Sequence, residues 1–152
     1  MTGWLSVRAA GLLAAAAVVA GCARPVPRAI AYAEESCRHC HMTIADPRFA
    51  AELVTSKGLV YAFDDVGCLA AFAREGTVRA GEVHSMWVYD YLRPDSLLDA
   101  RLAVYLEVDT LRTPMSSRLV ALRPGPEADS LRASLGGRLL RWDELPPRGH
   151  DG

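Results

Sequence analysis

A strand–strand–helix–strand pattern occurs twice in succession along the chain, and this repeat constrains the fold more than any other feature. In its first occurrence, two strand-like apolar runs are joined by a short segment that ends in Gly58, which is typical of an antiparallel hairpin. Asp64 or Asp65 is then the expected N-cap of a helix, and Gly76 its expected end. The four elements are predicted at residues 48–54, 59–63, 66–74 and 83–91.

The second occurrence has the same order of elements. Pro126 is a favourable first residue for a helix, and the pair Gly136-Gly137 is a favourable end. The strands of this unit are predicted at residues 101–108, 118–122 and 138–142. The repeat predicts an α+β fold made of two consecutive β-β-α-β units with mostly antiparallel strands.

Residues 1–21 have the pattern of an export signal. Arg8 supplies a positive charge, and the apolar stretch at residues 9–20 is too short to span a membrane comfortably. The stretch ends in Val19-Ala20-Gly21-Cys22, which is typical of a lipobox, so Cys22 is the predicted lipidation site. The alternative is an ordinary cleaved signal peptide. We therefore expect a protein of the periplasm or cell envelope that a lipid holds on a membrane without spanning it.

The rest of the chain divides into three parts. Residues 22–33 contain two prolines and no amphipathic pattern, so they are predicted to be a lipid-anchored tether. Residues 34–145 form one predicted metal-binding domain, and residues 146–152 a flexible tail. The 17 basic and 18 acidic residues give a net charge of −1, which argues against nucleic acid as a partner.

The segment Cys37-Arg38-His39-Cys40-His41-Met42 concentrates metal ligands, and it allows several interpretations. A disulfide between Cys37 and Cys40 suits an exported protein. A thioredoxin-like redox pair requires the first cysteine at a helix N-terminus after a strand, whereas here a tether precedes the motif. A closed zinc site requires a second pair of ligands, and His84 and His150 are isolated in the sequence.

A fourth interpretation is covalent haem, because Cys37-x-x-Cys40-His41 has the spacing of c-type haem attachment. Met86 or Met115 would then be the distal ligand. Small cytochromes c are helical, whereas most of this chain has strand patterns.

The fifth interpretation is a Cu(I) site. Cuprous ion prefers thiolate and thioether sulfur, with imidazole as an acceptable partner. On an extended segment Cys40 and Met42 point to the same side. Met115, which lies between two strands of the second unit, is the candidate third ligand, although a methionine there can equally fill a gap in the core. Cys68 is interpreted as a small buried hydrophobic residue.

Taken in order, these pieces resemble the NosL family of accessory lipoproteins, which act as copper chaperones in the assembly of nitrous oxide reductase. The matching segments are the lipobox at Cys22, Cys37-x-x-Cys40-x-Met42, residues 61–68 (YAFDDVGC), residues 87–91 (WVYDY), residues 99–105 and residues 113–121 (TPMSSRLVA). The resemblance covers about residues 34–145 and implies a fold of paired β-β-α units. The chain has His41 where the family usually has glycine, and Ser116 where the family tends to have glycine after the methionine.

The resulting hypothesis is a lipid-anchored Cu(I) metallochaperone rather than an enzyme. Cys40, Met42 and Met115 would hold one Cu(I), and Cys37, His39 or His41 would enter the coordination sphere during transfer. The resemblance implies nitrous oxide reductase, or its membrane assembly complex, as the acceptor. The alternatives are a c-type haem electron-transfer lipoprotein and a thiol–disulfide protein.

Overall fold

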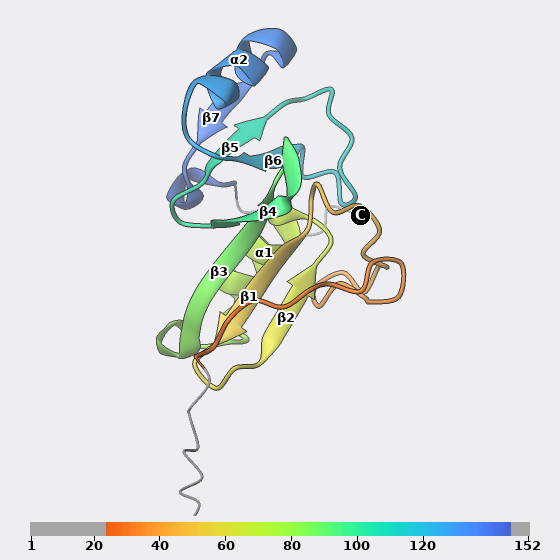
Figure 1. Ribbon diagram of the computed structural model, residues 1–152, viewed down its shortest axis with the longest axis vertical. Coiled ribbons are helices and arrows are strands. Elements are labelled where there is room, and N and C mark those ends of the chain that lie inside the picture. The colour runs from red at the N-terminus through yellow and green to blue at the C-terminus, as the bar shows by residue number, and fades with distance from the viewer. Residues whose placement is uncertain (1–23, 147–152) are drawn as a thin grey trace, which may run out of the picture.

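The computed structural model describes residues 24–146 (Figure 1), so the predicted signal peptide, Cys22, the last residues of the predicted tail and His150 lie outside the described part. Neither α-helix in residues 24–146 has the length and apolarity to cross a membrane. The elements are β1 (Ala51–Thr55), β2 (Val60–Phe63), α1 (Val66–Glu75), β3 (Val83–Asp90), β4 (Arg93–Asp99), β5 (Val104–Glu107), β6 (Leu119–Leu122), α2 (Pro126–Leu135) and β7 (Arg138–Leu140), with short 3-10 turns at Ala80–Glu82 and Trp142–Glu144.

The two sheets repeat one strand order, which confirms the predicted α+β architecture. The first sheet runs β2-β1-β3-β4 and the second β6-β5-β7, with every paired neighbour antiparallel. In both sheets the first strand of the unit is central and the strand after the helix lies on its other side. The backbone N–H of Tyr91 donates to the carbonyl of Ala121 at 2.9 Å, so the end of β3 is joined directly to β6.

Strand β4 is absent from the sequence-based prediction. It extends the first sheet beyond β3 through the pairs Val88↔Leu98 and Tyr89↔Leu97. The run Pro94-Asp95-Ser96 has the composition of a loop, but proline is tolerated in an edge strand where its missing N–H faces away from the partner. Pairing with β3, which is a tertiary contact, therefore decides the conformation of this segment.

Helix α1 has the ends that the sequence predicts. Asp65 is the N-cap, and its side chain accepts a hydrogen bond from the backbone N–H of Gly67 at 2.7 Å. Gly76 ends the helix in the left-handed conformation, with φ of 71°. The ring of Phe72 lies 5.2 Å from that of Phe63, centroid to centroid, so α1 packs on the sheet face that carries Phe63.

Residues 28–33, predicted to be part of the tether, contact the fold and form a strap across the opposite face of the first sheet (Figure 1). Ile30 is buried in the main core, and Ala33 donates a backbone hydrogen bond to Ile44 at 2.8 Å. Tyr32 packs edge-on against Tyr89 of β3, with ring centroids 6.4 Å apart. Two apolar side chains among prolines are too short a pattern to predict such packing.

The strap covers a buried acid. Glu52, in the centre of β1, lies between Ala62 and Trp87 on the neighbouring strands and is fully buried. Neither carboxylate oxygen has a hydrogen-bond partner among residues 24–146. Burial raises the pKa of Glu52 from 4.5 to about 7, and the nearby Arg28 only partly opposes this shift. The fold therefore favours the protonated carboxyl.

We expect Glu52→Gln to remove a pH dependence of stability. A carboxyl whose pKa is raised by folding loses stabilising protonation as the pH rises from 4.5 to about 7, and the penalty above that pH is on the order of 3 kcal/mol. The free energy of unfolding of the wild type should fall between pH 5 and pH 8 more steeply than that of the variant. Glu34→Gln, at an exposed position, is the control, and equal slopes for wild type and Glu52→Gln would contradict the assignment.

Candidate metal centre

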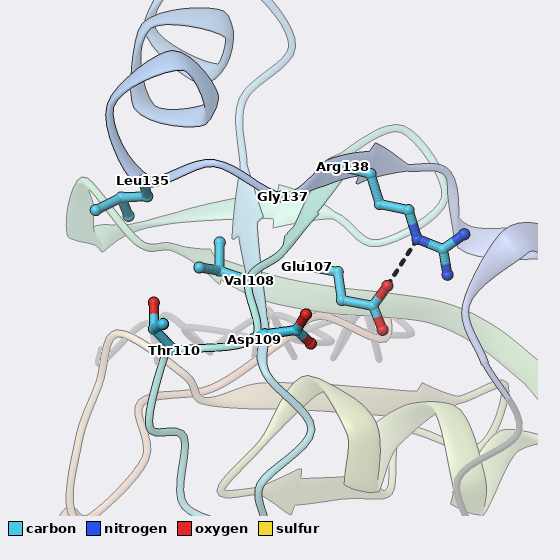
Figure 2. Close-up of a pocket in the computed structure, with 7 residues that line it drawn as sticks. All are labelled: Glu107, Val108, Asp109, Thr110, Leu135, Gly137 and Arg138. Atoms are coloured by element: carbon cyan, nitrogen blue, oxygen red, sulfur yellow. Dashed lines mark hydrogen bonds and ion pairs between the residues drawn. The ribbon is translucent and has the colours of Figure 1, made fainter.

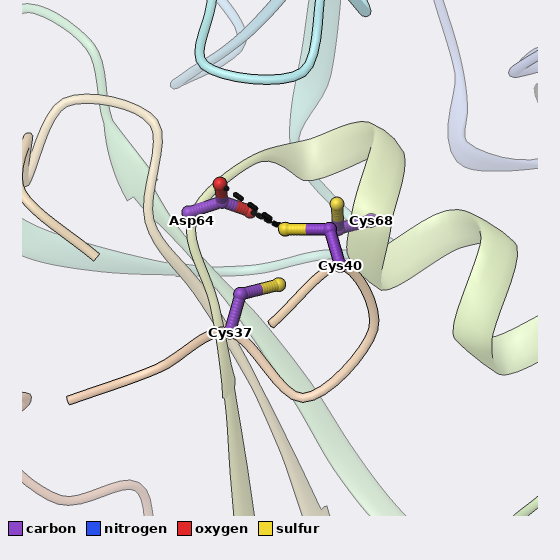
Figure 3. Close-up of side chains that lie close together, drawn as sticks. All are labelled: Cys37, Cys40, Asp64 and Cys68. Carbon is purple, nitrogen blue, oxygen red and sulfur yellow. Dashed lines mark hydrogen bonds between the residues drawn. The ribbon is translucent and has the colours of Figure 1, made fainter. Parts of the chain in front are cut away.

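Three thiols and one carboxylate converge beside the start of α1. The ligand atoms of Cys37, Cys40, Asp64 and Cys68 all lie within 4.8 Å of one another. Figure 3 shows two of these side chains on the cysteine loop, one just before the helix and one on the helix, with their tips directed toward a common point. All three cysteines are free thiols, so the disulfide considered between Cys37 and Cys40 is absent from this structure.

The cysteine loop, residues 36–43, is a closed turn. Ser36 and Thr43 form an isolated bridge, and the backbone N–H of Cys37 donates to the carbonyl of Met42 at 2.8 Å. His41 lies in the left-handed region, with φ of 63°, and its N–H donates back to the Cys37 carbonyl at 3.0 Å. These bonds bring Cys37 and Cys40 to the same side of the turn.

A backbone hydrogen bond places this loop against the first sheet. The N–H of Arg38 donates to the carbonyl of Ala62 in β2 at 2.9 Å, two residues before Asp64. The guanidinium of Arg38 also lies over the ring of Tyr61, 5.4 Å from its centroid. The loop is thus fixed beside the β2–α1 junction, where Asp64 and Cys68 are carried.

The three thiols of the cluster differ in pKa. The Cys40 thiol donates to the Asp64 carboxylate, with sulfur–oxygen distances of 3.4 Å to each oxygen, and burial raises the pKa of Cys40 to about 12. A hydrogen bond from Cys68 lowers the pKa of Cys37 to about 7, and the same bond raises the pKa of Cys68. Cys37 is therefore the first thiolate of the cluster, with the Cys68 thiol donating a hydrogen bond to it.

A loop from the second unit reaches the same helix end. The backbone N–H of Met115 donates to Asp65 Oδ2 at 3.1 Å, while Asp65 Oδ1 caps α1 through Gly67. A Cβ atom placed on Gly67 would lie 2.7 Å from the Cβ of Ser117, so this loop touches the first turn of α1. Met115 is half-buried against the main core. The structure thus brings the predicted third ligand next to the residues that flank Asp64.

Comparison with known proteins identifies the family and the fold of the chain. The NosL family model matches residues 29–149. The chain belongs to the NosL family. Its fold is similar to the crystal structure of the copper chaperone NosL from Shewanella denitrificans, with a TM-score of 0.67 and 22% identity over 80% of this chain and 96% of that chain. No curated protein sequence matches the chain. The family membership predicted from the ordered motifs is confirmed, and the NosL match begins within the strap rather than after it.

The candidate ligands chosen from the sequence occupy different places in this NosL fold. Cys37 and Cys40 are in the cluster, and Met115 lies on the adjoining loop. Met42 is 57% exposed, and His41 is also exposed, so both lie on the outer side of the cysteine loop. His39 turns toward the last turn of α1, where its Nδ1 lies 3.2 Å from a carboxylate oxygen of Glu75.

Sequence reasoning missed Asp64 and Cys68 as members of the site. The sequence pattern predicts Asp64 only as a helix cap, and the burial predicted for Cys68 is correct, but its sulfur points into the cluster. The objection that a second pair of zinc ligands is missing is therefore wrong. The available signal was weak, because Asp64 lies just before the N-cap Asp65, outside the helix, and helical spacing does not fix its position relative to Cys68.

The buried thiols do not suit covalent haem. Both sulfurs of a c-type attachment site must reach the edge of one porphyrin, whereas Cys37 is 1% exposed and its sulfur faces Cys68. His41, the axial ligand of that interpretation, is on the outside of a closed turn.

A separate pocket lies in the second unit (Figure 2). It has a volume of about 330 Å³ and is bordered by the ion pair between Arg138 and Glu107, at 2.7 Å. Its lining contains no sulfur or imidazole. It therefore offers none of the soft ligands found in the cysteine cluster.

We expect Gly67→Ala to separate the Met115 loop from α1. The added Cβ would meet Ser117 at 2.7 Å, a contact that the backbone must move to relieve, at a cost of about 1–3 kcal/mol of stability. Chemical unfolding measures this loss. Gly81→Ala is the matched control, because no atom lies within 4 Å of the position that its new methyl group would occupy. A Gly67→Ala protein as stable as the wild type would show that the loop does not depend on this contact.

Proposed function

We propose that this protein is a copper chaperone that binds one Cu(I) at the cysteine cluster and passes it to an acceptor protein. The observation that carries the proposal is the convergence of three free thiols next to the loop of Met115. Thiolate and thioether sulfur select Cu(I) over harder cations. The family match and the similar fold of a protein described as a copper chaperone support the same conclusion.

The proposed ligands are the thiolates of Cys37 and Cys40 with the thioether of Met115. Cys37 is the most acidic thiol and so offers a thiolate first, while Cys40 is only half-buried and lies toward the surface. A low-coordinate site of this kind can add a donor from an acceptor before it loses one of its own. Met42 and His41 are exposed and so are suited to that exchange. His39, which lies beside Glu75, is a further donor proposed for the transfer step.

The finer proposal concerns where the copper goes. The resemblance of the ordered motifs to the NosL family supports delivery for the maturation of nitrous oxide reductase, directly or through its membrane assembly complex. The lipobox at Cys22 supports a lipid anchor in the cell envelope, with residues between the anchor and the strap as the connection. The proposed role includes no turnover of a substrate, so the protein is not an enzyme in this proposal.

The first test is an anaerobic Cu(I) titration of reduced residues 23–152 against a chromogenic chelator. We expect one Cu(I) per chain, and losses of about tenfold or more in affinity for Cys40→Ser and for Met115→Leu, because each removes a soft donor. Met86→Leu, a matched change in the core of β3, should leave the affinity unchanged.

Two outcomes of this titration would contradict the proposal. One is failure of the wild type to compete for Cu(I), and the other is unchanged affinity in both site variants. Expressing the protein with haem-attachment machinery tests the alternative at the same time, since a Soret band would favour the electron-transfer role. Insulin-reducing activity lost in Cys37→Ser would favour the thiol–disulfide role.

The acceptor is tested in cells that make nitrous oxide reductase and depend on this chaperone. We expect reductase purified from cells with Cys40→Ser to contain less copper than reductase from wild-type cells, because the metal is not delivered. The same cells carrying Met86→Leu are the control. A full copper content in the Cys40→Ser cells would disprove the assignment of nitrous oxide reductase while leaving Cu(I) binding itself untouched.

A further inference from the structure

The cysteine cluster contains donors that a Cu(I) site does not need. Cuprous ion is satisfied by two or three soft ligands, whereas carboxylate is a hard ligand. Yet Asp64 is 2% exposed, and its two oxygens each lie 3.4 Å from the sulfur of Cys40. Cys68 is also buried, with its sulfur in the same group. A buried carboxylate among three thiols thus requires a separate explanation.

We propose that Cys37, Cys40, Asp64 and Cys68 form a four-ligand site for Zn(II) that is filled when Cu(I) is absent. Zinc in closed protein sites takes four ligands in a tetrahedron, with cysteine sulfur at about 2.3 Å and carboxylate oxygen at about 2.0–2.2 Å. Ligand atoms around such an ion lie about 3.3–3.8 Å from one another. The four atoms here lie within 4.8 Å, so small movements of the side chains would close the tetrahedron.

The positions of the ligands in the chain agree with a zinc site. Two cysteines in a Cys-x-x-Cys turn supply one pair, and a helix start supplies the other pair four residues apart, a spacing that structural zinc sites commonly use. The turn is held by its own backbone hydrogen bonds and by the bond from Arg38 to Ala62. These contacts fix the orientation of the ligands before any ion arrives, as outer contacts do in zinc proteins.

The charge of the loaded site is also tolerable. Zn(II) binding releases the protons of the three thiols to solvent, so three thiolates and one carboxylate surround a dication. The N-terminus of α1 faces this net negative charge, since Cys68 lies in the first turn of that helix. Calcium and magnesium are excluded as the natural ions because both require oxygen ligands.

Zinc would give the chaperone a metal-protected resting state in an oxidising compartment. Coordinated thiolates are held apart from oxidants, so Cys37, Cys40 and Cys68 would stay available for copper. On loading, Cu(I) takes two or three sulfur donors, Zn(II) leaves as the aqueous ion, and any thiolate left over takes up a proton. This displacement step rests on the proposed copper function, whereas zinc binding itself does not.

The test is an anaerobic Zn(II) titration of the reduced, metal-free protein against a chromogenic zinc chelator. We expect one Zn(II) per chain, with affinity reduced about tenfold or more in Asp64→Asn and in Cys68→Ser. Asp90→Asn, which changes another fully buried carboxylate far from any cysteine in the sequence, should bind zinc as the wild type does. Co(II) in place of zinc should show the visible bands of a tetrahedral ion with thiolate ligands, and Asp64→Asn should alter them.

Met115→Leu distinguishes Cu(I) binding from Zn(II) binding, because it removes a proposed copper ligand and no zinc ligand. It should weaken Cu(I) binding and leave Zn(II) binding unchanged. No stoichiometric Zn(II) in the wild type, or wild-type zinc affinity in both Asp64→Asn and Cys68→Ser, would overturn the inference even where Cu(I) binds. Zinc binding without any Cu(I) binding would instead contradict the copper function and uphold this site. Thermal unfolding of each metal-free variant identifies any that fails to fold, and the half-buried Cys40→Ser then replaces it.

Discussion

The fully buried carboxylate of Asp65 joins the first turn of α1 to the loop of Met115. One oxygen caps α1 through Gly67 at 2.7 Å, and the other accepts the backbone N–H of Met115 at 3.1 Å. The first bond fixes the turn of helix that carries Cys68, and the second docks the loop of the second unit onto it. Because a buried carboxylate without partners is costly, loss of either bond would leave an oxygen of Asp65 unsatisfied. The contact between the two halves of the chain beside the cluster therefore depends on this side chain.

The candidate site combines buried side chains with exposed donors. Cys37, Asp64 and Cys68 are buried, and backbone hydrogen bonds hold Cys37 and Cys68, whereas Met42 and His41 are exposed on the outer side of the cysteine loop. A carrier of a soft ion needs both properties, because deep burial excludes oxidants and competing ligands while exposed donors permit handover. The repeat of two β-β-α-β units supplies this geometry, since it brings the connection before β6 against the start of α1.

The sequence predicted the turns and helix ends that short-range interactions determine, and it missed the elements that depend on tertiary contacts. The hairpin at Gly58, the cap at Asp65 and the end of α1 at Gly76 follow from short-range rules, and the structure has all three. Strand β4 and the strap are formed by pairing and packing with β3, which no local pattern encodes. Asp64 and Cys68 were missed for the same reason. They become candidate metal ligands only when the cysteine loop, residues 36–43, folds beside them.

The left-handed residue of the cysteine loop shows how such a site can vary within one family. His41 has φ of 63°, a conformation that glycine adopts without strain and that costs other residues about 1 kcal/mol. The hydrogen bonds from Cys37 to Met42 and from His41 to Cys37, which close the turn, join backbone atoms alone. The imidazole is exposed on the outside of this turn, whereas the thiols of Cys37 and Cys68 are buried. A left-handed residue at this position lets the chain turn back, so that Cys37 and Cys40 lie on the same side of the loop.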